Sequence, residues 1–213
     1  MKSIVTTILW TIFCTIAIPT VSQAETTGES AAANELIEIL NQTTSLQGQF
    51  QQNQYDSQNM LLAESSGHFR MLRPGYFSWQ IESPDSQQII ATPEYLWHYD
   101  MDLETVTRRP VTGSGAMSPL QILGGREELL RSQFSVSKSA SGIFTLVPHD
   151  SEPGFVSLSL TLENNTISAM EIIDALNQRV VISFQAIDSN SELVIDDFAF
   201  TPPDGVDLFY YDE

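Results

Sequence analysis

Cysteine is nearly absent from this sequence of 213 residues, and its single copy lies close to the start. Cys14 falls inside the uncharged run of residues 4–18, which follows Lys2 and precedes the small-residue pattern Ser22-Gln23-Ala24. A basic residue, a short apolar core and small residues in this order are typical of a secretory signal peptide. We therefore predict that residues 1–24 are a signal peptide, cleaved after Ala24, and that the exported chain has no cysteine.

Lysine is almost as rare, because Lys2 and Lys138 are the only lysines. Nine lysines and arginines stand against 27 aspartates and glutamates, so the formal net charge is -18 at pH 7, and loss of Lys2 makes it one unit more negative. This charge disfavours nucleic acid and anionic membrane surfaces as partners. It serves solubility in the simplest interpretation, and in a second one it forms a docking surface for a basic partner.

Long apolar runs are missing after residue 24, where none reaches the roughly 18 to 20 residues that a membrane-spanning helix needs. The segment 25–213 is long enough to bury a full core without disulfides. It shows no internal repeat and no low-complexity linker. We therefore expect residues 25–213 to form a single soluble domain, and nothing in the sequence demands more than a monomer.

Helical spacing occurs once near the start of this segment, where Leu36, Ile37 and Leu40 fall at i, i+1 and i+4. Farther along, the pattern changes to a period of two residues, which predicts a series of strands separated by turns. The expected strands are residues 46–55, 61–72, 77–82, 87–91, 95–99, 103–109, 134–138, 144–148, 156–162, 167–174, 180–186 and 193–200.

The strand series is interrupted after residue 109 by a Gly/Ser/Thr-rich stretch that leads to Ser118-Pro119. Serine before proline is typical of a helix start, and leucines at 120, 123, 129 and 130 predict one or two short helices there. Many short strands with few helices favour a strongly curved antiparallel sheet or barrel, with sequential strands paired. The helices would then cover the concave side of the sheet.

Motifs of enzymes are absent: the sequence has no Gly-x-Ser-x-Gly elbow, no glycine-rich phosphate loop and no His-Glu-x-x-His. The three histidines, His68, His98 and His149, are far apart in sequence and give no support to a metal site. Asp196 and Asp197 would point to opposite faces of an expected strand, so they would not share one acid–base site. We predict no catalytic residue, no metal and no cofactor.

Large apolar side chains recur at every second residue of the expected strand 77–82, where Phe77, Trp79 and Ile81 share one face. The strand 95–99 repeats the spacing with two tyrosines and a tryptophan. An ordinary core is one interpretation. The other is the wall of a cavity kept partly open for an apolar ligand.

Arg73 opens the turn Arg73-Pro74-Gly75 just before the first of these strands. A guanidinium in a turn commonly lies on the surface and contributes little to stability. Its fork of donors can also bind the free carbonyl groups at a helix end. In that position Arg73 would hold a helical lid shut.

Several further motifs follow one another along the chain, and each of them alone is weak. Together they extend over nearly all of residues 25–213, and with them the sequence resembles the LolA family of periplasmic outer-membrane lipoprotein carriers. The motifs are Leu46–Gln51, Gly67–Phe77, Trp79, Leu96–Asp100, Asp102–Thr107, Ser118-Pro119-Leu120 and Phe198–Val206.

The resemblance implies an unclosed, strongly curved antiparallel β-barrel covered by a helical lid, with a hydrophobic cavity between them. It implies that Arg73 hydrogen-bonds the lid and stabilises its closed state. The residues that would line the lipid-binding cavity or contact the lid are Phe77, Trp79, Ile81, Ile89, Leu123, Leu36 and Leu40.

The function implied by the resemblance is that of a non-enzymatic periplasmic chaperone. Such a carrier accepts acylated lipoproteins that an ATP-driven inner-membrane transporter releases, shields their acyl chains and delivers them to an outer-membrane lipoprotein acceptor. Two alternatives share the fold: a lipid-anchored outer-membrane acceptor, which the lack of a cysteine after the expected cleavage site disfavours, and a periplasmic lipid or envelope-stress sensor. A periplasmic hydrolase and a purely structural interaction module, which would bind no lipid, are rivals from other classes.

Overall fold

The computed structural model describes residues 24–111, 127–150 and 154–211. Leu123 and the expected helix start at Ser118-Pro119 lie outside the described residues. Two α-helices, α1 (Ala24–Asn41) and α3 (Glu127–Gln133), and the 3-10 helix η1 (Ile195–Phe198) accompany the strands. The strands are β1 (Ser45–Tyr55), β2 (Leu61–Leu72), β3 (Tyr76–Ser83), β4 (Gln87–Ala91), β5 (Tyr95–Asp100), β6 (Thr105–Pro110), β7 (Phe134–Lys138), β8 (Phe144–Pro148), β9 (Phe155–Glu163), β10 (Thr166–Asp174), β11 (Arg179–Ser189) and β12 (Asp207–Tyr210).

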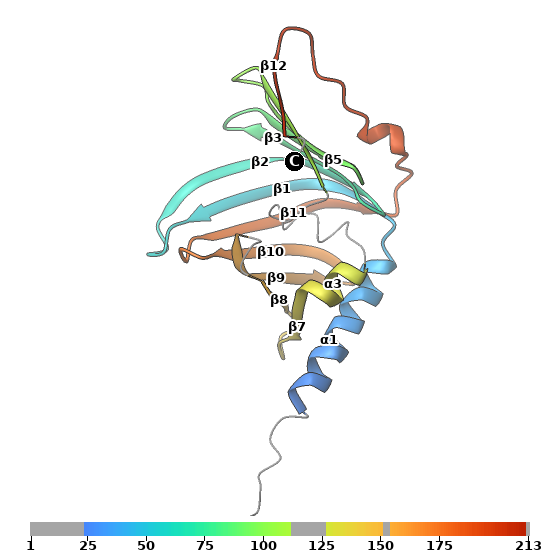
Figure 1. The fold of residues 1–213 in the computed structure, drawn as a ribbon. Helices are drawn as coiled ribbons and strands as arrows, with labels where there is room; N and C mark the ends of the chain where they lie inside the picture. Colours follow the sequence, from blue (N-terminus) through green and yellow to red (C-terminus); the bar gives the residue numbers. More distant parts are fainter. Residues whose placement is uncertain (1–23, 112–126, 151–153, 212–213) are drawn as a thin grey trace, which may run out of the picture.

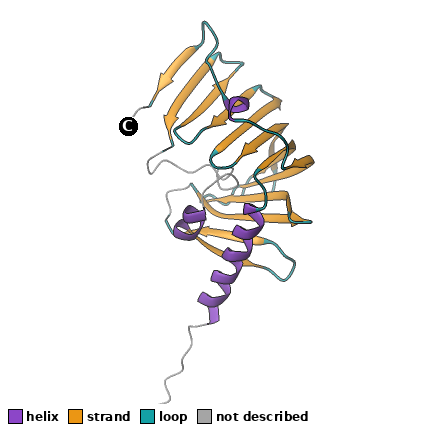
Figure 2. Cartoon of the chain, turned by 90° about the vertical axis from the view of Figure 1, so that its right-hand side faces the viewer, coloured by secondary structure: helices purple, strands orange, loops and turns teal. Residues whose placement is uncertain are grey.

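All of these strands belong to one 12-stranded sheet, in the order β12-β6-β5-β4-β3-β2-β1-β11-β10-β9-β8-β7. The sheet curls strongly, and its two end strands, β12 and β7, are not paired with each other (Figures 1 and 2). The predicted fold class, mainly β with short helices and an unclosed curved antiparallel sheet, is confirmed.

Pairing follows the sequence within two meanders, β1 to β6 and β7 to β11. The expectation of purely sequential pairing is wrong at two places. First, the meanders join through β1 and β11, where Phe50 lies opposite Phe184, so β6 and β7 are far apart in the sheet. Second, β12 runs parallel to β6, with Leu208 opposite Val106.

Helix α1 confirms the helical spacing around Leu36, and it packs against β7 and α3 at one end of the strands (Figure 1). Leu36 and Leu40 are buried in its contact with the sheet. Polar contacts at the edge also join these elements: the Lys138 ammonium lies 2.6 Å from the Glu35 carboxylate, and Arg131 donates to the Asn34 side chain at 2.6 Å.

One large hydrophobic cluster fills the space between the helices and the sheet, because period-two strands turn one apolar face to the same side. Its members come from nearly every strand and include Phe50, Trp79, Leu158 and Phe184 along with the apolar face of α1. This cluster is the main core, and it joins the two meanders into a continuous apolar layer.

The other face of the sheet, which we call the outer face, carries a smaller buried layer. This outer layer includes Ile90, Val106 and Phe198. The chain from β11 to β12 covers this face. The strand expected at 193–200 is wrong, because η1 forms there: the Asp197 side chain accepts a hydrogen bond from the Val194 N–H at 2.8 Å and holds the turn. Asp197 therefore supports local backbone structure rather than alternating with Asp196 along a strand.

Among the described helices, none combines the length and apolar character needed to cross a membrane.

Candidate functional site

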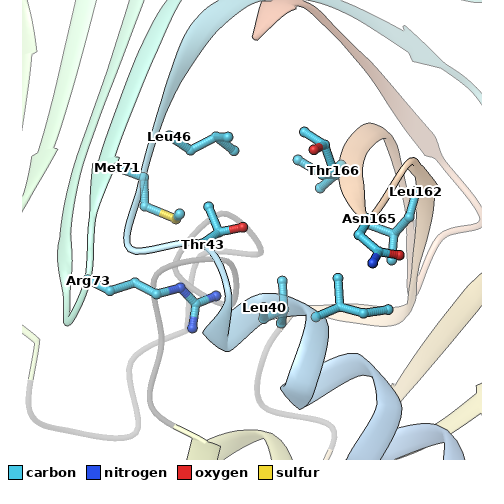
Figure 3. Close-up of a pocket in the computed structure, with 10 residues that line it drawn as sticks. Leu40, Thr43, Leu46, Met71, Arg73, Leu162, Asn165 and Thr166 are labelled. Atoms are coloured by element: carbon cyan, nitrogen blue, oxygen red, sulfur yellow. The ribbon is translucent and has the colours of Figure 1, made fainter. Parts of the chain in front are cut away.

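A pocket opens where the last turn of α1 meets the sheet (Figure 3). Helix α1 contributes Ile39 and Leu40, and the loop after it contributes Thr43. The opposite wall comes from both meanders, so the pocket lies at the junction that joins them. Its remaining lining residues are Leu46, Met71, Arg73, Leu162, Asn165, Thr166 and Ile167.

The described lining is mostly apolar, and its polar residues are Thr43, Arg73, Asn165 in the β9–β10 turn and Thr166 at the start of β10. An apolar pocket with a few polar groups is the usual form of a site for an apolar ligand. No acid–base pair or nucleophile lies among these residues. The chemistry that the pocket offers is therefore burial of an apolar group beside a cation.

Among the described residues of this lining, Arg73 alone is charged. Its backbone N–H donates to the Thr44 carbonyl at 2.8 Å, which fixes the turn after β2 beside the end of α1. Figure 3 shows its side chain extending toward Leu40 and Thr43. Burial lowers the pKa of the Arg73 guanidinium to about 10, because desolvation disfavours the charged form. The guanidinium still carries its charge at neutral pH.

A group of packed aromatic side chains, which we call the aromatic group, connects the pocket with the core. Met71 of the pocket lies opposite Phe77 on β3, and the Phe77 ring stacks on Trp79 with 5.9 Å between the ring centroids. Trp79 also stacks on Phe50 at 3.6 Å and meets the edge of Phe184 at 6.3 Å. The pocket is thus the outer end of a continuous apolar layer rather than an isolated surface dent.

Comparison with known proteins identifies the family of this chain. The family model described as outer membrane lipoprotein carrier protein LolA matches residues 41–201, a range that holds nearly the whole pocket lining and the aromatic group. The chain belongs to the LolA family.

Relatives named outer-membrane lipoprotein carrier protein support the assignment. The LolA-family protein of Chromohalobacter salexigens is 32% identical over 197 residues, which cover 91% of this chain and 92% of the relative. That of Alkalilimnicola ehrlichii is 33% identical over 180 residues, 84% of each chain.

Solved structures agree on the fold. A LolA superfamily protein from Nitrosomonas europaea matches with a TM-score of 0.50 and 12% identity, over 79% of this chain and 98% of that one. A putative outer membrane lipoprotein-sorting protein domain from Vibrio parahaemolyticus matches with a TM-score of 0.50 and 10% identity, over 80% of this chain and 97% of that one. At these identities the likeness concerns the fold alone.

The structure of this LolA-family chain distributes the predicted site residues over the pocket and the core behind it. Leu40 and Arg73 line the pocket. Leu36, Phe77 and Trp79 are buried in the main core. The partly buried Ile81 and Ile89 pack against that core, and Leu123 lies outside the described residues.

The two aromatic strands do not share a face. Trp79 lies opposite Ile89 across β3 and β4, whereas Trp97 lies opposite Ile90 and so belongs to the other face. There the Trp97 ring lies 5.4 Å from that of Phe200. The pattern at 95–99 therefore belongs to the outer layer and contributes nothing to the pocket.

Sequence reasoning missed several residues of the pocket and its surroundings. Leu46 and Phe50 share the inward face of β1, and this alternation in the sequence could have identified them. Met71 follows the same alternation on β2. Asn165 lies in the β9–β10 turn and Thr166 at the first position of β10, and neither gave a comparable signal. In the described part of the chain, His, Cys, Asp and Glu nowhere gather in a group of three or more that could hold a metal ion.

Proposed function

We propose that this protein is a periplasmic carrier that shields the acyl chains of lipoproteins between the inner and the outer membrane. The observation that supports it best is the continuous apolar layer between α1 and the curved sheet, which ends in the pocket beside Arg73. The carrier would be residues 25–213 in a single domain, after removal of residues 1–24 as a signal peptide. It would act as a monomer and would catalyse no reaction itself.

The physical need for such a carrier follows from the cargo. An acyl chain of about fifteen methylenes, at about 0.8 kcal/mol each, represents roughly 12 kcal/mol against entering water. Unassisted passage through an aqueous compartment is therefore negligible. A carrier does not have to match the affinity of a bilayer, provided that it covers the chains and releases them to an acceptor that binds more tightly.

Two partners complete the proposal. An ATP-driven inner-membrane transporter would supply the work of extraction, and an outer-membrane lipoprotein acceptor would receive the cargo. The names of the LolA-family relatives support the handling of lipoproteins in general. The two partners are the simplest source and destination for such cargo.

Movement of α1 would open the site. In the described structure Leu36 and Leu40 of α1 occupy the apolar layer, so entering acyl chains would replace their contacts with the sheet. Arg73, beside the last turn of α1, would stabilise the closed state. Closed and open states need differ by only a few kcal/mol for cargo to shift the population.

The test is a release assay with the mature protein and inner membranes that hold a labelled acylated lipoprotein, with and without ATP. We expect ATP-dependent appearance of the label in a soluble one-to-one complex with this protein. A sensor of the same fold would bind free lipid but would release no lipoprotein, so binding without release would overturn the carrier proposal.

A further inference from the structure

Four large apolar side chains are exposed at the end of the sheet opposite α1. Met60, Leu61 and Leu62 at the β1–β2 hairpin are 63%, 50% and 53% exposed, and Leu176 in the β10–β11 turn is 72% exposed. We call these four residues the hairpin-tip patch. Figure 1 shows the two hairpins projecting side by side, away from the helices. A gathered group of exposed apolar side chains commonly marks an interaction site.

The two turns are held in fixed shapes by carboxylates. One Asp56 oxygen accepts the backbone N–H groups of Gln58 and Met60, at 2.9 and 2.8 Å. One Asp174 oxygen accepts those of Leu176 and Gln178, both at 2.8 Å. The apolar side chains of the patch are therefore presented from ordered backbone.

Arg179 ties the two hairpins together. It donates to the Asn59 side chain at 2.5 Å and to the Glu171 carboxylate at 3.1 Å, and its guanidinium lies 4.6 Å from the centre of the Tyr55 ring. Tyr55 itself lies opposite both Leu61 and Arg179 in the sheet. The patch thus spans two hairpins that are joined into one surface.

The β1–β2 hairpin also extends past its neighbour. Pairing of β2 with β3 begins at Ser66, so the described residues Leu61–Ser65 pair with β1 alone. Residues 61–64 are all exposed, so neither face of this overhang is covered by other described residues. Packing among the described residues gives no reason for apolar side chains at this place.

Charge around the patch indicates the kind of partner. The ends of the β1–β2, β3–β4, β5–β6 and β10–β11 hairpins all lie on this rim of the sheet, and in their described residues Arg179 is the only lysine or arginine. Carboxylates at these four ends are Asp56, Glu64, Glu82, Asp85, Asp100, Asp102, Glu104, Glu171 and Asp174.

We propose that the hairpin-tip patch and its carboxylate surround form a docking surface for a protein whose contact face is basic around an apolar centre. Apolar contact at the centre would supply affinity, and the opposite charges would orient the partner and speed its approach. A membrane is the less suitable occupant, because anionic headgroups would be repelled by this rim. The surface is separate from the pocket, so a partner could hold it while cargo passes at the other end of the strands.

The experiment uses purified mature protein together with the transporter and the acceptor. The inference rests on the proposed function only for the choice of these two partners. Binding is measured to proteoliposomes that hold the inner-membrane transporter, to the purified acceptor, and to protein-free anionic and zwitterionic vesicles. The test variant is Leu61→Ser/Leu176→Ser, and the matched control is Val194→Ser, at a residue that is 58% exposed and directly precedes η1. Circular dichroism checks that each variant is folded.

We expect the double variant to bind one of the two protein partners about tenfold more weakly, with the control unchanged, since an interface centre commonly loses this much on truncation. Glu64→Lys should weaken the same complex, and added salt should weaken the wild-type complex. Equal binding of wild type and double variant to both proteins would overturn the inference, as would patch-dependent binding to protein-free vesicles. Failure of wild-type release in the same preparations would instead count against the carrier function.

Discussion

Replacing Trp79 with alanine tests whether the aromatic core is also the wall of the cargo site. Trp79 is 2% exposed and contacts Phe50, Phe77 and Phe184. A buried tryptophan covers roughly 150 to 250 Å², which corresponds to about 4 to 6 kcal/mol at about 25 cal/mol per Å². Alanine keeps part of this contact, so we expect Trp79→Ala to lower the free energy of unfolding by about 3 to 5 kcal/mol.

A matched control lies on the other face of the same part of the sheet. Ile90 is 3% exposed and belongs to the outer layer, next in sequence to Ile89, which faces Trp79 across the strands. Ile90→Ala should lower the free energy of unfolding by about 2 to 5 kcal/mol. The two variants therefore lose similar stability from opposite faces, and only Trp79→Ala alters the apolar layer behind the pocket.

Urea unfolding followed by circular dichroism gives both free energies, and titration with a fluorescent long-chain fatty acid in the absence of urea gives the acyl affinity. An acyl chain that lies along the ring would lose on the order of 50 Å² of contact, or about 1.3 kcal/mol. We therefore expect Trp79→Ala to raise the Kd roughly tenfold and Ile90→Ala to leave it unchanged. Equal affinities in the two variants would refute the assignment of Trp79 to the cargo wall.

Four further outcomes follow from the contacts around the pocket. Arg73→Leu should accept cargo but deliver it poorly, because the closed state loses its cation; normal delivery in the transfer assay would contradict this role. Delivery should not vary with pH across the neutral range, because the lowered pKa of Arg73, about 10, leaves the guanidinium charged there. A zero-length carbodiimide cross-link between Lys138 and Glu35, mapped by mass spectrometry, should fix α1 on β7 and block cargo uptake; uptake by the cross-linked protein would exclude movement of α1. Gly67→Ala should lower the urea midpoint, because a methyl group there overlaps the Gln80 carbonyl oxygen, and an unchanged midpoint would show that the strands can separate at no cost.

Local sequence patterns were sufficient to predict the position of most strands, because most strands pair with a strand that is next to them in the sequence. The bounds of β2, β4, β7 and β8 agree with the expected ranges, and most other strands differ by one or two residues at an end. The segment 193–200 shows where composition misleads. It is rich in apolar and β-branched residues, yet the Asp197 side chain stabilises a turn, and the segment crosses the outer face of the sheet instead of pairing within it.

Long-range pairing accounts for what the sequence could not predict. Strand β12 is short and exposed, and it forms only against β6, about a hundred residues away in the chain. The face to which Trp97 belongs depends on the register of β5 against β4, which alternation alone does not specify. Arg73 was identified from its turn and its resemblance to a motif, but the pocket beside it requires α1, β9 and β10 to meet there.

The open course of the sheet bears on the size of cargo that the protein can accommodate. Because β7 and β12 are not paired with each other, the sheet can flatten or tighten its curl without breaking a ladder hydrogen bond. A closed barrel of the same strands would have a lumen of fixed girth. Here the girth is adjustable, so chains that differ in number and length can be accommodated by one sequence through small changes of twist spread over many strand pairs.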